Sequence, residues 1–207
     1  MHRILVISDG FFHPSLICRY AFKRLLTDLD EDFHFEFTKN INVLSALREK
    51  AYSAVILYFH KKRIKESALS GLEAFASKGG GVFAIHSAMA SFKTSSRYQK
   101  ILGGRFTGHG PIDDIAIRNV PSKIDIGLKS ISFSIKDELY IHDYDSDNDI
   151  LLEGVQNGIE EPILWIKCYG NGKVAYLSLG HRKAVFEQNE VKSIIEKVLN
   201  WISTREV

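Results

Sequence analysis

Polar side chains, several of them imidazoles, follow the short apolar runs of this sequence at the points where strands are expected to end. In an open α/β sheet, ligands bind beyond the carboxyl ends of the strands, so these side chains mark the place where a site is expected. Imidazoles titrate near neutrality and suit proton transfer in either direction. A single histidine is more often structural than catalytic, but the recurrence of the pattern favours a site. The residues that follow the runs at 4–7, 54–59, 82–85 and 174–177 are Ser8, Asp9, Gly10 and His13; His60 and Lys61; His86 and Ser87; and Ser178, Gly180, His181 and Arg182.

The segment at residues 84–88, Ala-Ile-His-Ser-Ala, has the composition of a nucleophile elbow. Such an elbow needs small neighbours because its central residue sits in a strained turn between a strand and a helix. The central residue is His86, and neither Cys18 nor Cys168 is near it in the sequence. Cysteine-dependent amidotransferase chemistry on glutamine is therefore disfavoured, because its nucleophile is missing. Ser87 stands one position later and would point differently, so a hydrolase with Ser87 as nucleophile is the weakest hypothesis.

Two further segments carry groups that suit a sugar or a proton relay. His109 lies in the glycine-rich stretch 103–110, whose glycines allow close backbone approach to a ligand or to neighbouring backbone. Residues 137–140, Asp-Glu-Leu-Tyr, place two carboxylates before an aromatic ring. This segment is either a solvated turn or a site where a carboxylate orients a histidine or binds sugar hydroxyls. Imidazoles and a carboxylate also suit a divalent metal, which is kept as an option without an assigned ligand set.

Two conspicuous patterns are interpreted as structural. The triple glycine at 79–81 precedes a strand, whereas a phosphate-binding loop follows a strand and opens a helix, so a helix C-cap with a tight turn is the better account. The alternating aspartates at 143, 145, 147 and 149 lack the central glycine and closing glutamate of a calcium loop, and a solvated loop is expected there.

The elements that must position these groups alternate between strand and helix in the first half. The runs at 4–7, 54–59 and 82–85 are continuously apolar, as parallel strands covered on both faces are. Such alternation predicts right-handed crossovers and a three-layer α/β/α sandwich. Residues 105–178 carry several β-like runs and few helix signals, which predicts a partly antiparallel extension of a mostly parallel sheet. We expect a single domain over residues 1–207, with no internal repeat.

Composition excludes several classes of protein. Apolar residues make up 45% and charged residues 25%, an ordinary globular mixture. The net charge of +2, from 27 basic and 25 acidic residues, predicts no nucleic-acid or membrane partner. The N-terminus has no signal-peptide pattern and the two cysteines form no CxxC pair, so a cytoplasmic location with reduced thiols is expected. A homodimer is expected on general frequency alone.

Three segments, in this order and spacing, resemble the ThuA-like (trehalose-utilisation) family. The first combines the glycine-strand-His-Ser-Ala block at 80–88 with a Gly-Gly-x-Phe-x-x-His block at 103–109. The second is the Asp-Glu-Leu-Tyr segment at 137–140. The third, at 170–181, resembles the closing strand of the family and its Gly-His. The match spans about residues 79–203, and the ordered set is more specific than any one motif.

The resemblance implies a flavodoxin-like sandwich of the class I glutamine amidotransferase type and a role in carbohydrate metabolism, on a disaccharide or an oxidised sugar. His86, His109, Glu138 and His181 match motif positions of the family. We therefore predict acid–base chemistry on a sugar hydroxyl or carbonyl, in which an imidazole is the general base and Glu138 orients or donates. The predicted catalytic residues are His86, Glu138 and His181, and the predicted substrate-binding residues are Asp9, Ser87, His109 and Tyr140.

The sequence departs from the family pattern at two places near the expected pocket. The family often has an acidic and an aromatic residue after His-Ser-Ala, where this chain has Met89 to Phe92. After the final Gly-His an aspartate is common, and here it is Arg182. These departures support an alternative hypothesis, a non-catalytic sugar-binding or regulatory module on the same fold. Fold alone cannot choose between them, because function belongs to the site.

Overall fold

A twisted nine-stranded sheet runs through the residues that the computed structural model describes, which are 1–11, 13–29, 32–128 and 130–204. Its strand order is β2-β1-β3-β4-β9-β8-β7-β5-β6. The first five strands in this order are parallel, and the pairs from β9 to β6 are antiparallel. The parallel strands are β1 (His2–Asp9), β2 (Phe33–Thr38), β3 (Ala54–Phe59), β4 (Gly81–Ile85) and β9 (Gly172–Leu177).

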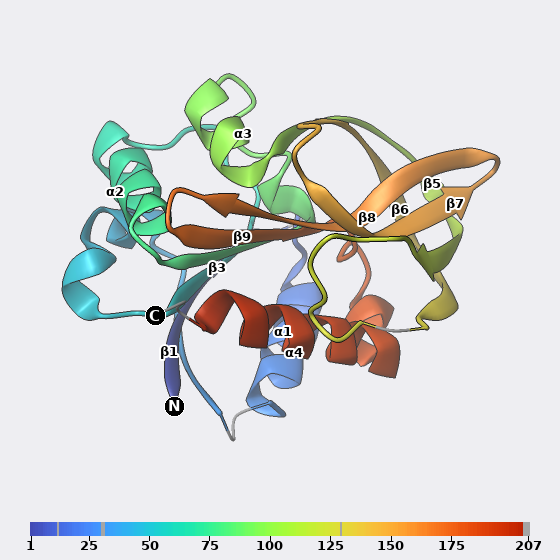
Figure 1. Cartoon of the computed structure of the whole chain (residues 1–207), viewed down its shortest axis with the longest axis horizontal. Coiled ribbons are helices and arrows are strands. Elements are labelled where there is room, and N and C mark those ends of the chain that lie inside the picture. The colour runs from blue at the N-terminus through green and yellow to red at the C-terminus, as the bar shows by residue number, and fades with distance from the viewer. Residues whose placement is uncertain (12, 30–31, 129, 205–207) are drawn as a thin grey trace.

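Helices cover both faces of the parallel half, as Figure 1 shows. The helices α1 (Leu16–Thr27) and α4 (Asn189–Ser203) share one buried apolar cluster with the sheet. The helices α2 (Glu66–Ser77) and α3 (Ser96–Leu102) share a second cluster on the opposite face. Every residue of β3 is buried, because a strand between two helical layers has no face exposed to water. Four short 3-10 helices complete the described elements: η1 (Ile41–Ala46), η2 (Arg48–Lys50), η3 (His86–Ala88) and η4 (Lys183–Glu187).

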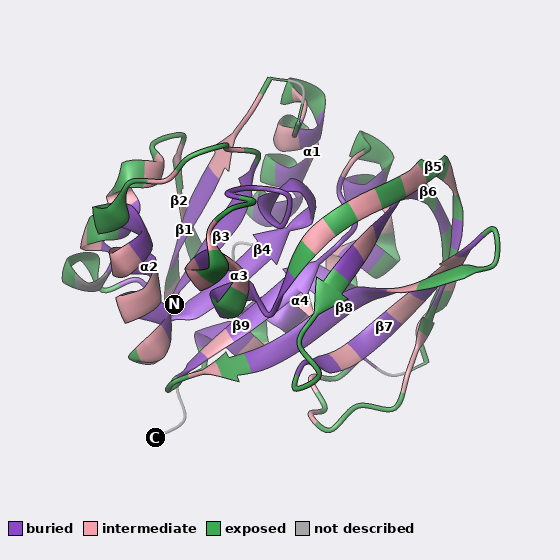
Figure 2. Ribbon diagram, turned by 90° about the horizontal axis from the view of Figure 1, so that it is seen from above, coloured by how far each residue is buried: buried purple, intermediate pink, exposed green. Residues whose placement is uncertain are grey.

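The antiparallel half is a curled extension rather than a flat continuation of the sheet (Figure 1). It consists of β5 (Gly104–Asn119), β6 (Ser132–Tyr144), β7 (Asp149–Gln156) and β8 (Ile159–Tyr169). Strands β5 and β6 form a long ribbon whose pairing register shifts twice, between Phe106 and Gly108 and between His109 and Ile112. Register shifts of this kind bend a strand and increase its twist. Figure 2 shows that β5 alternates between exposed and less exposed residues, so one face of this ribbon meets solvent.

The structure confirms the predicted three-layer α/β sandwich with an antiparallel extension. Helix α3 was not anticipated from the sequence, and the glycine-rich stretch 103–110 belongs largely to strand β5. No helix among the described residues is long and apolar enough to cross a membrane.

Candidate active site

His86 directly follows β4 and is the first residue of η3. Its φ of +45° is a left-handed backbone that residues other than glycine rarely adopt, which matches the strained turn predicted at the centre of this segment. Gly180 allows the loop after β9 to come close. A Cβ at Gly180 would lie 3.0 Å from the His86 Cβ, and the φ of Gly180 is +144°. The two strand ends therefore meet closely because one of them carries glycine.

The His86 ring is buried. One of its nitrogens forms a hydrogen bond, and the other has no hydrogen-bond partner among the described residues. Its Nδ1 lies 2.7 Å from the Ser178 carbonyl oxygen, which can only accept, so Nδ1 carries the proton in the neutral ring. The Nε2 is then a lone-pair acceptor, and it is buried without a hydrogen-bond partner among the described residues. Burial lowers the pKa of His86 to about 3, against the opposing effect of the Ser178 carbonyl. His86 is therefore neutral at physiological pH.

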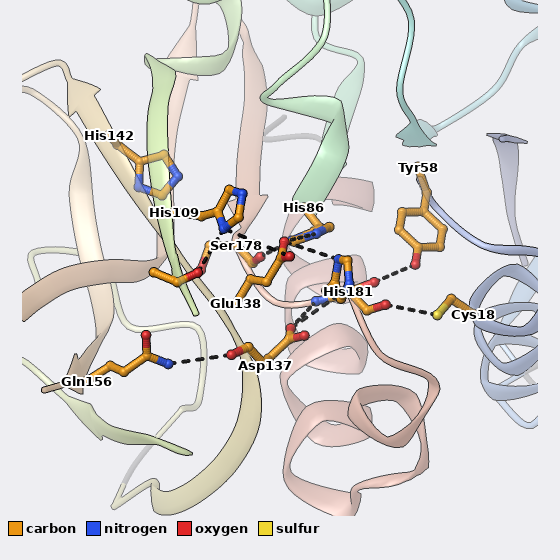
Figure 3. Close-up of polar contacts among 12 residues, drawn as sticks. Cys18, Tyr58, His86, His109, Asp137, Glu138, His142, Gln156, Ser178 and His181 are labelled. Atoms are coloured by element: carbon orange, nitrogen blue, oxygen red, sulfur yellow. Dashed lines mark hydrogen bonds and ion pairs between the residues drawn. The ribbon is translucent and has the colours of Figure 1, made fainter. Parts of the chain in front are cut away.

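Glu138 is the carboxylate at the centre of the cluster (Figure 3). It lies on β6, is 8% exposed, and is surrounded by imidazoles. Its Oε2 is 3.1 Å from the His181 Nδ1 and 3.8 Å from the His86 Nε2, and its Oε1 is 3.9 Å from the His109 Nδ1. Burial raises the pKa of Glu138, but the hydrogen bond from His181 and the nearby imidazoles outweigh this effect, so the net direction is downward. The same hydrogen bond raises the pKa of His181.

Asp137 fixes the loop that carries His181. Its Oδ2 accepts hydrogen bonds from the backbone N–H of Gly180 at 2.8 Å and of His181 at 3.2 Å. The Tyr58 hydroxyl donates to the Gly180 carbonyl at 2.6 Å, and the Cys18 thiol donates to the His181 carbonyl at 3.1 Å. Burial raises the pKa of Asp137 to about 6, although the two N–H donors act in the opposite direction. The two carboxylates therefore have different roles. Asp137 holds the backbone of the His181 loop, and Glu138 faces the histidines (Figure 3).

This arrangement decides between the two interpretations of residues 137–140. They form part of a buried strand and not a solvated turn. Tyr140, on the same strand, stacks obliquely against His86 with ring centroids 4.1 Å apart. His109 lies at the exposed rim, and its Nδ1 is also 2.8 Å from the Gly110 carbonyl oxygen. The structure therefore brings together five of the seven predicted residues, namely His86, Glu138, His181, His109 and Tyr140.

The other two predicted residues are placed differently. Asp9 lies at the end of β1 and forms an ion pair with Lys61. Ser87 is 1% exposed, and its hydroxyl has no hydrogen-bond partner among the described residues. A serine nucleophile needs a base within hydrogen-bonding reach, and Ser87 has none in the described structure.

His13 joins the cluster although the sequence motifs did not select it. It follows β1, is exposed, and its ring centroid lies 4.9 Å from that of His181. One ligand atom from each of His13, Glu138 and His181 lies within 4.8 Å of the others. The only advance signal for His13 was its place after a strand, shared with many residues that do not reach the site.

Cys18 also comes to the site through the fold, on α1 behind the His181 loop. Burial raises the pKa of its thiol, so it remains protonated and serves as a hydrogen-bond donor. Cys168 is exposed on β8. Neither residue provides the thiolate of an amidotransferase at the elbow.

Comparisons with known proteins identify the fold and the family of this chain. Two solved ThuA-like proteins share the fold. The one from Parabacteroides merdae is 18% identical with a TM-score of 0.83, and the match covers 100% of this chain and 92% of that one. The one from Bacteroides uniformis is 18% identical with a TM-score of 0.80, covering 97% and 91%. A protein of Salmonella typhimurium described as cytoplasmic is 13% identical with a TM-score of 0.64, covering 98% and 100%.

At these identities the structural matches show the fold alone. No curated protein sequence is significantly similar to this chain. The sequence model of the ThuA family, described as trehalose utilisation, matches residues 3–202 and so nearly the whole chain. The chain therefore belongs to the ThuA family, whose description supports a role in carbohydrate metabolism.

Proposed function

We propose that this protein is an enzyme that performs acid–base chemistry on a sugar or an oxidised sugar at the cluster of His86, Glu138 and His181. The ligand in this proposal is a small-molecule carbohydrate, and the proposed location is the cytoplasm. The family supports the carbohydrate class. The choice of chemistry rests on the site itself.

The observation that carries the proposal is the buried, unpartnered Nε2 of His86. A buried polar atom without a hydrogen bond is costly, and such atoms in native proteins call for a functional reason. The Ser178 carbonyl fixes the tautomer, so the lone pair of Nε2 faces the space beside Glu138. Because this atom is enclosed in the free protein, a sugar hydroxyl would become its missing partner only after neighbouring side chains move to admit the substrate. His86 is the proposed proton acceptor.

The hydrogen-bonded pair of Glu138 and His181 forms the electrophilic side of the site. Glu138 is held ionised by the imidazoles around it, so it orients His181 and does not donate a proton. His181 is partly exposed and can contact a hydroxyl or carbonyl oxygen of the substrate. Tyr140 is 3% exposed and packs against both His86 and Phe106, so it helps to hold the His86 ring in place.

The test is turnover of a panel of disaccharides and keto-sugars by the wild-type protein and by His86→Asn. Asparagine tolerates the left-handed backbone at this position, so the variant is expected to fold. Removal of a general base typically lowers the rate by about 10²–10⁴-fold, and we expect a loss in this range. His34→Ala removes an exposed imidazole on β2 and is the matched control, with unchanged turnover.

Three outcomes contradict the proposal. Full activity of His86→Asn on an identified substrate would remove His86 from its role. A saccharide that binds to the wild-type protein but is never transformed would favour the sugar-binding or regulatory module. Labelling of Ser87 by a serine-directed covalent probe would instead favour the hydrolase hypothesis.

A further inference from the structure

We propose that His13, Glu138 and His181 form a binding site for a divalent transition-metal ion. This inference deepens the proposed function and rests on it for the role of the ion in the reaction. It assigns the electrophile of the site to a metal held by residues from three separate parts of the chain. His13 comes from the loop after β1, Glu138 from β6 and His181 from the loop after β9.

The distances in the cluster are close to those of a metal centre. The Glu138 Oε2 and His181 Nδ1 are 3.1 Å apart, and one ligand atom from each of the three residues lies within 4.8 Å of the others. Ligand atoms about 2.0–2.1 Å from a tetrahedral ion lie about 3.3 Å apart. The farthest pair would therefore close by about 1.5 Å on binding. The exposed His13 ring can make this movement, because it is not packed in the core.

A second observation points to the same space. His86 is 1% exposed, and its unpartnered Nε2 lies 3.8 Å from the Oε2 of Glu138, which is one of the three proposed ligands. The cluster thus has one carboxylate, Glu138, among several imidazoles, and the buried lone pair of the His86 Nε2 lies close to this carboxylate. A substrate oxygen held by an ion at His13, Glu138 and His181 would lie within reach of that lone pair.

The donor set selects the class of ion. Two imidazole nitrogens and one carboxylate oxygen suit Zn²⁺, Fe²⁺, Co²⁺ or Mn²⁺, whereas Mg²⁺ and Ca²⁺ prefer oxygen ligands throughout. Three protein ligands leave coordination positions open, as catalytic metal sites require. An ion there would polarise a carbonyl or hydroxyl oxygen of the sugar as a Lewis acid while His86 accepts the proton. No other group of this kind occurs among the residues that the structure describes.

The loop that carries His181 is built to hold it in place. Its backbone is fixed by Asp137, Tyr58 and Cys18, which lie on three different elements. Metal sites depend on such supporting contacts, which keep ligands oriented in the absence of the ion. His13 is the adjustable ligand by contrast, so its loss should weaken metal binding without disturbing the core.

The experiment uses the full chain, stripped with a chelator and titrated with Zn²⁺ and with Co²⁺ as a coloured probe. The readouts are bound metal per chain and the visible absorption of the Co²⁺ complex, and neither depends on turnover. We expect one equivalent in the wild-type protein and at least about tenfold weaker binding in His13→Ala and in Glu138→Gln. His34→Ala removes an exposed histidine at the opposite end of the parallel strands, where His34 pairs with Arg3 at the start of β1, and should bind like the wild type. His86→Asn should keep the metal and lose turnover.

Failure of this inference is distinguishable from failure of the proposed function. Equal metal affinity of the wild type and His13→Ala would overturn the site, since the ion would then sit elsewhere. Turnover by protein that binds no metal would also overturn the site and leave the acid–base proposal standing. Stoichiometric binding that depends on His13 and Glu138, without turnover of any sugar, would support the site and overturn the enzyme proposal.

Discussion

At the scale of single residues, the site depends on backbone that ordinary residues adopt only under strain. His86 has a φ of +45° and is held there by the β4 strand before it and the Ser178 carbonyl beside it. Strain of this kind clusters at functional sites, where the surrounding structure maintains it. The unpartnered Nε2 and the positive φ both support the role proposed for His86.

Replacing His86 with valine should destabilise the protein more than replacing it with asparagine. A β-branched side chain is poorly compatible with a left-handed backbone, whereas asparagine adopts it readily. The expected difference in the free energy of unfolding is about 1–2 kcal/mol. Urea denaturation of the two variants at neutral pH measures it. Equal stability of the two variants would show that the φ at this position is not a constraint.

Gly180→Ala should cost more stability than a matched glycine substitution in open space. A Cβ at Gly180 meets His86 at 3.0 Å and Ile85 at 3.3 Å. Gly158 also has a positive φ, of +79°, but nothing lies within 4 Å of an added Cβ. Gly158→Ala should therefore lower the free energy of unfolding by about 1–2 kcal/mol, from the backbone conformation alone. Gly180→Ala should lower it by more. In the urea comparison, the extra loss in Gly180→Ala reports the contacts with His86 and Ile85 together with the φ of +144° at this glycine, and an equal loss in both variants would contradict the expectation.

At the scale of elements, the important connection joins β6 to the loop after β9. Asp137 accepts two backbone hydrogen bonds from that loop, and its neighbour Glu138 contacts the His181 ring. Because side chains alternate along a strand, adjacent residues on β6 serve the backbone and the ring from different sides. Two consecutive carboxylates can thus have different roles within one site.

Asp137→Ala should destabilise the protein by about 2–4 kcal/mol, because it leaves one buried and one partly buried N–H group without acceptors. Tyr58→Phe removes one neutral hydrogen bond to Gly180 and should cost about 1 kcal/mol. Asp137→Asn keeps an acceptor oxygen and should recover part of the loss. Chemical denaturation of the three variants gives the ranking. A loss in Asp137→Ala no larger than in Tyr58→Phe would mean that Asp137 does not hold this loop.

At the scale of the whole molecule, the site lies where the two halves of the sheet meet. β9 belongs to the parallel half, and β6 is the last strand of the antiparallel half. Glu138 still reaches His181, because the register shifts in the β5–β6 pair curl the ribbon back (Figure 1). Ile115, Ile135 and Leu139 pack into the same apolar cluster as α4, which fixes the curl. The site is therefore a product of long-range packing.

Zn²⁺ should raise the melting temperature of the chelator-stripped protein. A ligand present at about 100 times its Kd stabilises by roughly 2.7 kcal/mol. For a chain of this size each kcal/mol corresponds to about 2–4 °C, so a rise of about 5–10 °C is expected. His13→Ala should show little of this rise, and His34→Ala should show all of it. A wild-type shift that persists unchanged in His13→Ala would contradict the proposed ligand set.

The sequence by itself determined the features that local patterns encode. Continuous apolar runs gave the buried parallel strands, because a strand between two helical layers must be apolar on both faces. Small residues around His86 marked the strained turn, and motif order selected Glu138 and His181. Helix α3 escaped notice because seven residues give too little periodicity to recognise.

Only the tertiary structure decided which groups meet. His13 and Cys18 carry no local signal that separates them from other histidines and cysteines, and the motif at 137–140 did not indicate that Asp137 would hold the loop of His181. They reach the site because β1 neighbours β3, α1 packs beside η4, and β6 curls back over the loop after β9. Convergence depends on contacts between segments more than a hundred residues apart, as in the bond between Cys18 and His181. Such contacts follow from how whole layers pack. They cannot be predicted from the spacing of residues within one segment.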